Sequence, residues 1–382
     1  MKLFDPVAQG TFIKRPNRFI VMAEINGKIE QCYCPNPGRL IELLIPGTPL
    51  LFELNPGPAT KYTLSAAIRG NMTIPLYSSR ANKVAAQLIL PRLFPESSKV
   101  KAEFTHGNSR FDFMIDDGQI KKLIEIKACT LIEQGVASFP DAPTIRGLRH
   151  LSELAEADAR EYKGMIIFVV FNPEAEHFVP NWHTDFDFAR ALYQHRNTID
   201  IKVFRVSTDQ KGECQLIPGE LAIFWDKLKP HLIDGGVYLY ILELDKETEL
   251  NIGQLGKFCF QKGWYVYTGS ARKNLDARIR RHLSKRKKFH WHIDYLGEKA
   301  KTKKILAIRN QFSWECELAA SVNELSLHFV PGFGSSDCHC QSHLFYFNEN
   351  PFHNRDFLDM LFFIVIKNPF YKLTKTIQHP PR

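Results

Sequence analysis

Three polar residues in one short segment have the types and spacing needed for phosphodiester chemistry. Asp112 lies in FDFMIDD, and Glu125 and Lys127 lie in LIEIKA, beyond a turn at Asp116-Asp117-Gly118. Residues two apart in a strand face the same way, so Glu125 and Lys127 project together beside Asp112 of the preceding strand. Two carboxylates can hold Mg²⁺ or Mn²⁺, and the lysine can position the metal-activated water. An exposed Glu–Lys ion pair is the simpler explanation of E-x-K taken alone.

The segment that follows adds groups that suit a phosphate. FPDAPTIRGLRHLSEL contains Arg146, Arg149, His150 and Glu153 at three- and four-residue spacing, which places them on one side of a predicted helix. A solvent-exposed helix face would look similar. The density of phosphate-compatible groups favours a binding site, so we expect Arg146, Arg149 and His150 to contact nucleic acid.

A second set of residues with catalytic types lies in the last part of the chain: Tyr238, Tyr267, Arg278 and Glu315. A tyrosine hydroxyl can relay a proton from water, and an arginine can spread positive charge over phosphoryl oxygens. A carboxylate can hold a single Mg²⁺. Glu317 is a rival for this ligand role. Aromatic strands that pack a core would explain either tyrosine alone.

Positive charge is concentrated near this second set. Of 50 Lys and Arg and 41 Asp and Glu, residues 1–230 carry 28 and 26, so +2, and residues 231–382 carry 22 and 15, so +7. Nine basic residues and one acidic residue lie between Arg272 and Lys288. A solvated basic face is the usual explanation, but beside candidate catalytic residues we predict a ridge that follows phosphates without reading bases. Its predicted contacts are Arg272, Lys273, Arg280, Arg281, His282, Lys285, Arg286, Lys287 and Lys288.

Cysteine and histidine residues form a third cluster. Cys338, Cys340 and His343 could bind zinc, although zinc sites more often use C-x2-C pairs than C-x-C. His290, His292 or Cys316 could complete such a site. We favour a structural role for this cluster, as a tight turn that seals the domain, and consider a zinc site the second explanation.

The surrounding sequence predicts α/β and α+β domains that hold these residues. Short alternating strands over residues 12–80, with a hairpin at Asn26-Gly27, predict a small barrel of oligonucleotide-binding (OB) type or a related one. Helices and buried strands then alternate, which predicts a mixed α/β core. A Pro/Gly-rich boundary falls at Lys227–Gly236. The predicted domains are residues 1–82, 83–230 and 231–348, with a tail at 349–382 that docks as a final helix or strand.

Composition excludes several classes of protein. Eight cysteines in 382 residues are too few for a disulfide scaffold, and the first residues lack the apolar core of a secretion signal. No run of 18 apolar residues occurs, so we expect no membrane span. A cytoplasmic protein with reduced thiols is the expectation, and the basic segment points to nucleic acid before an anionic membrane.

Residues of the first set occur in motifs that resemble the sugar fermentation stimulation protein A (SfsA) family. The motifs are NPGRLIELLIPG, SRFDF, EIKACTL and FPDAPTIRGLRHLSEL, and the likeness covers roughly residues 10–225. It implies an OB-like barrel and a PD-(D/E)XK nuclease-type core, with Asp112 and Glu125 as metal ligands and Lys127 as the catalytic lysine. It also favours DNA over RNA as the partner, and Arg39 of NPGRL joins the expected nucleic-acid contacts. Pro37 stands where the family tends to have threonine.

The second set resembles the GIY-YIG nuclease superfamily. Residues 233–347 carry the ordered tyrosines, KKFHWHIDYL, an E-C-x-L-A helix and FGSSDCHCQSHLFYF. The resemblance makes Tyr238, Tyr267, Arg278 and Glu315 the catalytic set, with Glu315 as metal ligand. Together the two likenesses predict a metal-dependent nuclease with two modules. The alternative is a non-catalytic DNA-binding regulator of sugar-metabolism genes.

Overall fold

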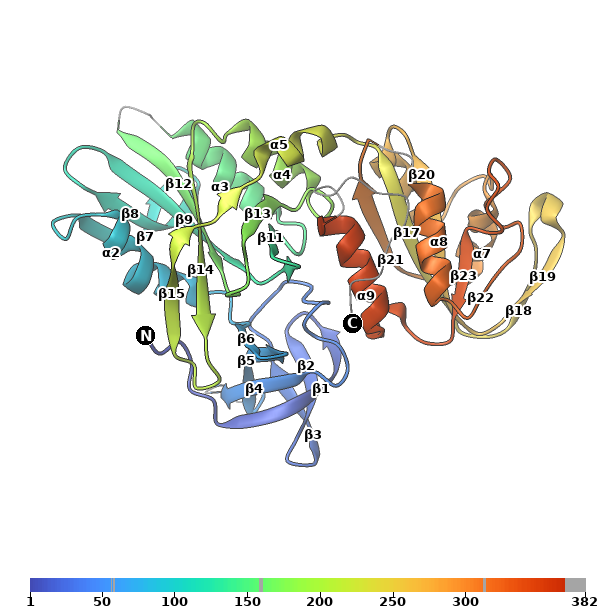
Figure 1. Ribbon diagram of the computed structural model, residues 1–382, viewed down its shortest axis with the longest axis horizontal. Coiled ribbons are helices and arrows are strands. Elements are labelled where there is room, and N and C mark those ends of the chain that lie inside the picture. The colour runs from blue at the N-terminus through green and yellow to red at the C-terminus, as the bar shows by residue number, and fades with distance from the viewer. Residues whose placement is uncertain (56, 58, 158–160, 312–313, 368–382) are drawn as a thin grey trace. The chain divides into compact units, whose positions relative to one another are not determined.

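The protein, described by a computed structural model, folds as two compact units, Met1–Trp225 and Asp226–Arg382 (Figure 1). The structure describes residues 1–367 except 56, 58, 158–160 and 312–313. The short helices α5 (Trp225–Leu228) and η2 (Lys229–His231) lie at the division. No helix in the described part of the chain is long and apolar enough to cross a membrane. The eight cysteines form no disulfide.

The first unit begins with a closed barrel. Strand β1 pairs with both β2 and β4, and β3 closes the barrel by pairing in parallel with β5. Asn26 and Gly27 both have positive φ, 52° and 73°, as the predicted hairpin between β2 and β3 requires. The OB-like prediction is therefore confirmed. The strands are β1 (Ala8–Asn17), β2 (Ile20–Ile25), β3 (Lys28–Tyr33), β4 (Pro49–Leu54), β5 (Tyr62–Arg69) and β6 (Met72–Pro75).

A six-stranded sheet in the order β15-β14-β12-β9-β8-β7 forms the core that follows the barrel. Strand β12, the apolar run predicted to be central, lies between β9 and β14, parallel to both. Helices α3 and α4 share one hydrophobic cluster with this sheet, and α1, η1 and α2 share another. The strands are β7 (Lys99–His106), β8 (Ser109–Asp116), β9 (Lys121–Cys129), β12 (Tyr162–Val170), β14 (Asp200–Thr208) and β15 (Cys214–Glu220).

The remaining elements of the first unit are short. Pro91 lies within the first turn of α2, where a proline is tolerated, so the helical segment that begins at Arg80 continues past it. A small sheet, β10-β11-β13-β16, lies apart from the main sheet in the pairing scheme. The elements are α1 (Arg80–Val84), η1 (Ala85–Ile89), α2 (Leu90–Leu93), β10 (Ile132–Glu133), β11 (Val136–Phe139), α3 (Ile145–Glu156), β13 (His177–Pro180), α4 (Phe186–Gln194) and β16 (Ala222–Ile223).

The second unit is built on a five-stranded antiparallel sheet, β21-β17-β20-β23-β22. One hydrophobic cluster joins the sheet to α6 and α7, and another joins it to α8 and α9. The predicted tail begins as helix α9, whose Phe357 and Leu361 are buried in the second cluster. Residues 368–382 of that tail lie outside the described residues.

Helix α7, strand β21 and the hairpin β18–β19 carry no clear signal in the sequence and were not predicted from it. Strand β21 has an exposed, lysine-rich first half, which hides the alternation that marks a strand. The elements of the second unit are β17 (Gly236–Leu244), β18 (Thr248–Asn251), η3 (Gly253–Leu255), β19 (Lys257–Phe260), β20 (Gly263–Ala271), α6 (Leu275–Leu283), α7 (His292–Lys299), β21 (Lys301–Arg309), α8 (Glu315–Leu325), β22 (His328–Phe329), β23 (Leu344–Phe347), η4 (Pro351–His353), α9 (Arg355–Phe362) and η5 (Phe363–Lys367).

Candidate active sites

The first candidate site lies where β8 and β9 run side by side. Their register, Phe113 opposite Ile124, brings Asp112 and Glu125 to the next position of the strand pair. The Ile126 backbone N–H donates to Asp112 Oδ2 at 2.7 Å. Lys127 Nζ donates to Glu125 Oε1 at 2.6 Å. The structure therefore brings the three predicted residues together.

His150 is a partner of Glu125 that spacing did not reveal. Its ring is 1% exposed, and Nδ1 lies 2.7 Å from Glu125 Oε1. Arg146 Nε donates to His150 Nε2 at 3.3 Å, which leaves the ring proton on Nδ1, the nitrogen that lies beside the carboxylate. His150 is thus placed behind the carboxylate, in the interior, and not on a surface that nucleic acid could reach. The sequence signal was only its position on the inner side of α3.

The two carboxyl groups differ in acidity for physical reasons. Burial raises the pKa of Asp112, and the charge of Glu125 raises it further. Burial would also raise the pKa of Glu125, but His150 and Lys127 outweigh burial and hold this pKa below its usual value. Asn82 of α1 donates to Asp112 Oδ1 at 2.6 Å. Glu125 Oε2 is buried and accepts no hydrogen bond from the described residues, so it is available to a cation.

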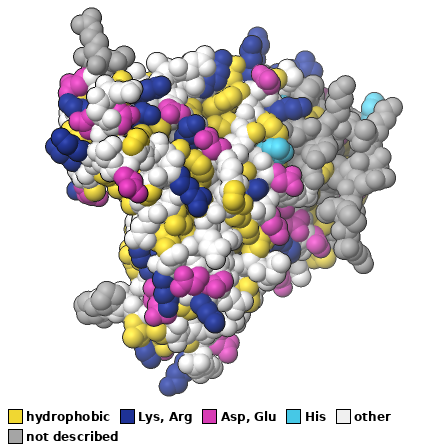
Figure 2. All heavy atoms as spheres, turned by 60° about the vertical axis from the view of Figure 1, so that its left-hand side comes forward, with side chains coloured by type: hydrophobic (Ala, Val, Ile, Leu, Met, Phe, Trp, Pro, Cys, Tyr) yellow, Lys and Arg dark blue, Asp and Glu magenta, His cyan; other side chains and the backbone are white. Residues whose placement is uncertain are grey.

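The first candidate site opens into a cavity of about 710 Å³. The wall of this cavity includes Asp112, Glu125 and Lys127 and also Arg146 of α3. Arg146 and Arg149 are exposed, as contacts with a polyanion require. Arg39 is half-buried, and burial lowers the pKa of its guanidinium while Asp141 opposes that shift. On the face drawn in Figure 2, basic side chains are interspersed with acidic ones and form no single patch.

The second candidate site is centred on two buried tyrosines of neighbouring strands. Tyr238 on β17 is 1% exposed and Tyr267 on β20 is 6% exposed, with ring centroids 6.3 Å apart. Gly269 lies opposite Tyr238, and a Cβ there would be 2.4 Å from the Tyr238 hydroxyl, so only glycine fits. Burial raises the pKa of both tyrosines, and Arg278 opposes the shift in each.

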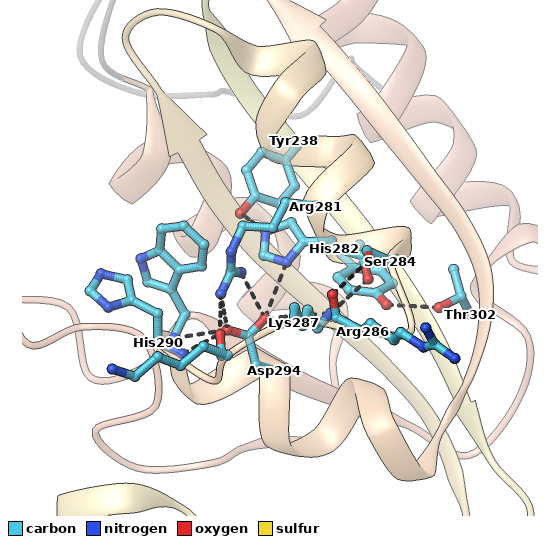
Figure 3. A network of polar contacts seen from close by, with 12 residues as sticks. Tyr238, Arg281, His282, Ser284, Arg286, Lys287, His290, Asp294 and Thr302 are labelled. Carbon is cyan, nitrogen blue, oxygen red and sulfur yellow. Dashed lines mark hydrogen bonds and ion pairs between the residues drawn. The ribbon is translucent and has the colours of Figure 1, made fainter.

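A network of polar contacts starts at the Tyr238 hydroxyl (Figure 3). The hydroxyl lies 2.8 Å from His282 Nε2, and His282 Nδ1 lies 3.7 Å from Asp294 Oδ1. Asp294 is fully buried and receives two hydrogen bonds from Arg281, at 3.0 and 2.9 Å. Burial lowers the pKa of His282. The pKa of Asp294 is also lowered, because the hydrogen bonds that Asp294 receives outweigh the effect of burial. Burial therefore favours the neutral form of His282, whereas Asp294 is favoured in its charged form.

The other two members of the predicted catalytic set lie on helices. Arg278 on α6 stacks its guanidinium 4.1 Å from the centroid of the Trp291 ring. Glu315, the first residue of α8, accepts from the Ser270 hydroxyl through Oε2 and lies 3.1 Å from His343 Nδ1 through Oε1. Glu317, the rival ligand, is exposed. The structure therefore places Glu315 beside Ser270, the residue that follows Gly269 on β20.

The basic segment divides into two groups. Arg281, His282 and Lys287 turn inward around Asp294, with Lys287 Nζ 3.5 Å from Oδ1. The remaining predicted contacts lie on the surface. The exposed members are Arg272, Lys273, Arg280, Lys285, Arg286 and Lys288. Asp294, which organises the inward group, was not identified from the sequence because its only signal is a carboxylate close behind a basic run.

Three cysteines and one histidine lie close together in the second unit, although C-x-C spacing is not typical of a metal site. Ligand atoms of Cys316, Cys338, Cys340 and His343 all lie within 4.8 Å of one another. Neither His290 nor His292 belongs to this group; His292 Nδ1 instead accepts the Gly334 N–H at 3.0 Å.

Models of known protein families match three consecutive parts of the chain. Residues 13–75 match the SfsA N-terminal OB domain, and residues 79–212 match the sugar fermentation stimulation protein RE domain. Residues 237–362 match the domain of unknown function DUF123, a GIY-YIG-like family. The DUF123 match includes α9, which we had assigned to a separate tail.

Individual relatives place the chain in a family. A sugar fermentation stimulation protein homolog of Desulfitobacterium hafniense (strain Y51) is 44% identical over 193 residues, 50% of this chain and 85% of the relative. The homolog of Pyrobaculum arsenaticum is 39% identical over 197 residues, 51% of this chain and 85% of the relative. The structure of Pyrococcus furiosus SfsA in complex with Ca²⁺ has a TM-score of 0.53 and 28% identity, covering 59% of this chain and 99% of its own. The chain combines an OB barrel, an SfsA core and a GIY-YIG-like domain, and it belongs to the SfsA family.

Proposed function

We propose that this protein is a nucleic-acid-binding, metal-dependent nuclease with two sites for phosphodiester hydrolysis, and that DNA is its substrate. The observation that carries the proposal is the grouping of Asp112, Glu125 and Lys127 on the wall of one cavity. Two carboxylates and a lysine at a cavity wall supply the groups that metal-assisted hydrolysis needs.

In the first site, Asp112 and Glu125 would hold Mg²⁺ or Mn²⁺, since both metals take carboxylate oxygens. The unpartnered Glu125 Oε2 supports this assignment, as does the Ca²⁺ bound to the Pyrococcus furiosus relative. The bound metal supplies Lewis-acid activation of water and of a phosphoryl oxygen. Lys127 orients the attacking water, and His150 keeps Glu125 charged and correctly turned.

The second site works through a proton relay. Tyr238 would take a proton from the attacking water as it passes its own proton to His282 Nε2. Asp294 stabilises the positive charge that then forms on His282. Arg278 would stabilise charge on the phosphoryl oxygens, and Glu315 would hold a single divalent metal. The exposed basic residues of the segment 272–288 would follow the phosphate backbone.

The test is cleavage of labelled single- and double-stranded DNA and RNA with Mg²⁺, Mn²⁺ or EDTA. Wild type, Glu125→Ala, Glu315→Ala and the double variant are compared. We expect metal-dependent cutting of DNA, with one activity lost in each single variant and both lost in the double variant. Metal-dependent cutting that survives in the double variant would refute the assignment.

A non-catalytic DNA-binding regulator is the alternative function, and the name of the relatives, sugar fermentation stimulation protein, is the observation that favours it. Tight, salt-sensitive binding of DNA without cleavage in any metal would establish that alternative. A shared fold does not guarantee a shared activity.

A further inference from the structure

Four soft ligands converge at one point of the second unit. Cys316 comes from the first turn of α8, Cys338 and Cys340 come from the segment between β22 and β23, and His343 directly precedes β23. Their ligand atoms lie within 4.8 Å of one another, and Cys338 Sγ lies 3.5 Å from His343 Nε2. Two separate stretches of the chain therefore bring three thiols and one imidazole nitrogen together.

The distance between Cys338 Sγ and His343 Nε2 fits a tetrahedral metal. Zinc bonds of ordinary length imply about 3.7 Å between two sulfurs and about 3.5 Å between a sulfur and a nitrogen. Thiolates select zinc over the hard cations proposed for the carboxylate sites. We propose that Cys316, Cys338, Cys340 and His343 bind one Zn²⁺, in what is here called the Cys3His site.

The cysteines of this cluster differ from the chain's purely structural ones. Cys32 and Cys34 are fully buried in the barrel and behave as small apolar side chains. Cys316 is exposed, and Cys338 and Cys340 are partly exposed. A hollow of about 180 Å³ lined by Cys316 and Cys340 gives an ion a path to the thiols. Packing alone gives no reason for three accessible thiols to meet.

Zinc at this position would also organise the proposed nuclease site. The two nitrogens of His343 face opposite ways: Nε2 faces Cys338, and Nδ1 lies 3.1 Å from Glu315 Oε1. Histidine ligands of zinc commonly donate their other N–H to a carboxylate, which fixes the ring. Zinc bound to Nε2 would leave the ring proton on Nδ1, and the Nδ1–H group would then donate to Glu315. This consequence rests on the proposed function, whereas zinc binding does not.

The first experiment measures zinc in the full-length protein purified under reducing conditions. We expect one zinc per chain by elemental analysis, released when a mercurial reagent titrates the thiols. Cobalt exchanged into the site should give the visible absorption bands of tetrahedral thiolate coordination. Cys340→Ser should lose the metal, and Cys259→Ser, which changes an exposed thiol of β19, should retain it.

Several results would overturn the proposal. These are wild-type protein without zinc after reduction and reloading, cobalt spectra without thiolate bands, and full zinc retention by Cys340→Ser. A disulfide among Cys316, Cys338 and Cys340 in protein that cannot be loaded with zinc would make the cluster a redox pair instead. The cobalt spectrum uses wild-type protein, so the proposal remains testable if the variant fails to fold.

The positioning role has its own readout. In Glu125→Ala protein, which retains only the second carboxylate site, removal of zinc should weaken Mn²⁺ binding by about 10–100-fold, as measured by electron paramagnetic resonance. Unchanged Mn²⁺ affinity would remove the link between His343 and Glu315. Zinc bound by a chain that cleaves no nucleic acid would leave the Cys3His site standing and refute the proposed nuclease function alone.

Discussion

The two candidate sites are built in opposite ways. The first site takes its main residues from two strands that follow each other in sequence, and its charged groups contact one another directly, as in the Lys127–Glu125 pair. The second takes its residues from β17, β20, α6 and α8, and each functional group is held by a neighbour, as His282 holds Tyr238. The comparison shows that a local site depends on strand register, whereas a dispersed site depends on a layer of supporting contacts.

The largest expected effect tests the relay of the second site. Tyr238→Phe removes one hydroxyl from a buried ring and should lower cleavage by the second site by about 10²–10⁴-fold. Cleavage that depends on Glu125 should be unchanged. The measurement is single-turnover cleavage in a Glu125→Ala background for the second site and in a Glu315→Ala background for the first. Tyr240→Phe, on the same strand as Tyr238, is the matched control, since the Tyr240 hydroxyl bonds Thr302 Oγ1 of β21. Equal loss in both variants would contradict the relay.

A large effect on stability is expected at Asp294. Asp294→Asn leaves Arg281 and Lys287 without their buried countercharge and should lower the free energy of unfolding of the second unit by about 3–5 kcal/mol. The pKa of Asp294 is lowered on folding, so its stabilisation is present above the unfolded pKa and is lost as pH falls. Denaturant unfolding at several pH values should show the difference from wild type shrinking in acid. A difference independent of pH would contradict this account.

A smaller effect is expected from replacing His150, the residue that supports Glu125 in the first site. His150→Gln removes a partner that holds the pKa of Glu125 down, so burial should raise this pKa. The acidic limb of the pH–rate profile should therefore move to higher pH, and metal affinity should fall by about 10–100-fold. Arg190→Gln, an exposed change on α4, is the control. An unshifted acidic limb would show that His150 only fills space.

The smallest effect concerns the basic surface. Lys285→Ala, Arg286→Ala and Lys288→Ala remove exposed charges of the second unit, and each lost phosphate contact should reduce the salt slope of DNA binding by about 0.9. Binding isotherms at several salt concentrations measure this slope. Lys211→Ala, an exposed lysine of the first unit, is the control. An unchanged slope would locate the phosphate contacts elsewhere.

Local spacing predicted much of the fold and the grouping of the first site. The hairpin at Asn26-Gly27 and the central strand β12 follow from turn chemistry and from a continuous apolar run. Asp112, Glu125 and Lys127 come together as predicted because one turn joins their strands. Strand β21 and helix α7 could not be predicted in this way, because exposed lysines and short length remove the periodic signal.

The supporting residues show what the sequence could not reveal. The order of the candidate catalytic residues and the excess of positive charge after residue 230 can be read from the sequence alone. Three contacts depend on the tertiary structure: His150 with Glu125, Asp294 with the inward-facing basic residues, and Cys316 with Cys338, Cys340 and His343. These pairs are far apart in the chain or lie on different elements, so their contacts follow from how sheets and helices pack, which local periodicity does not encode.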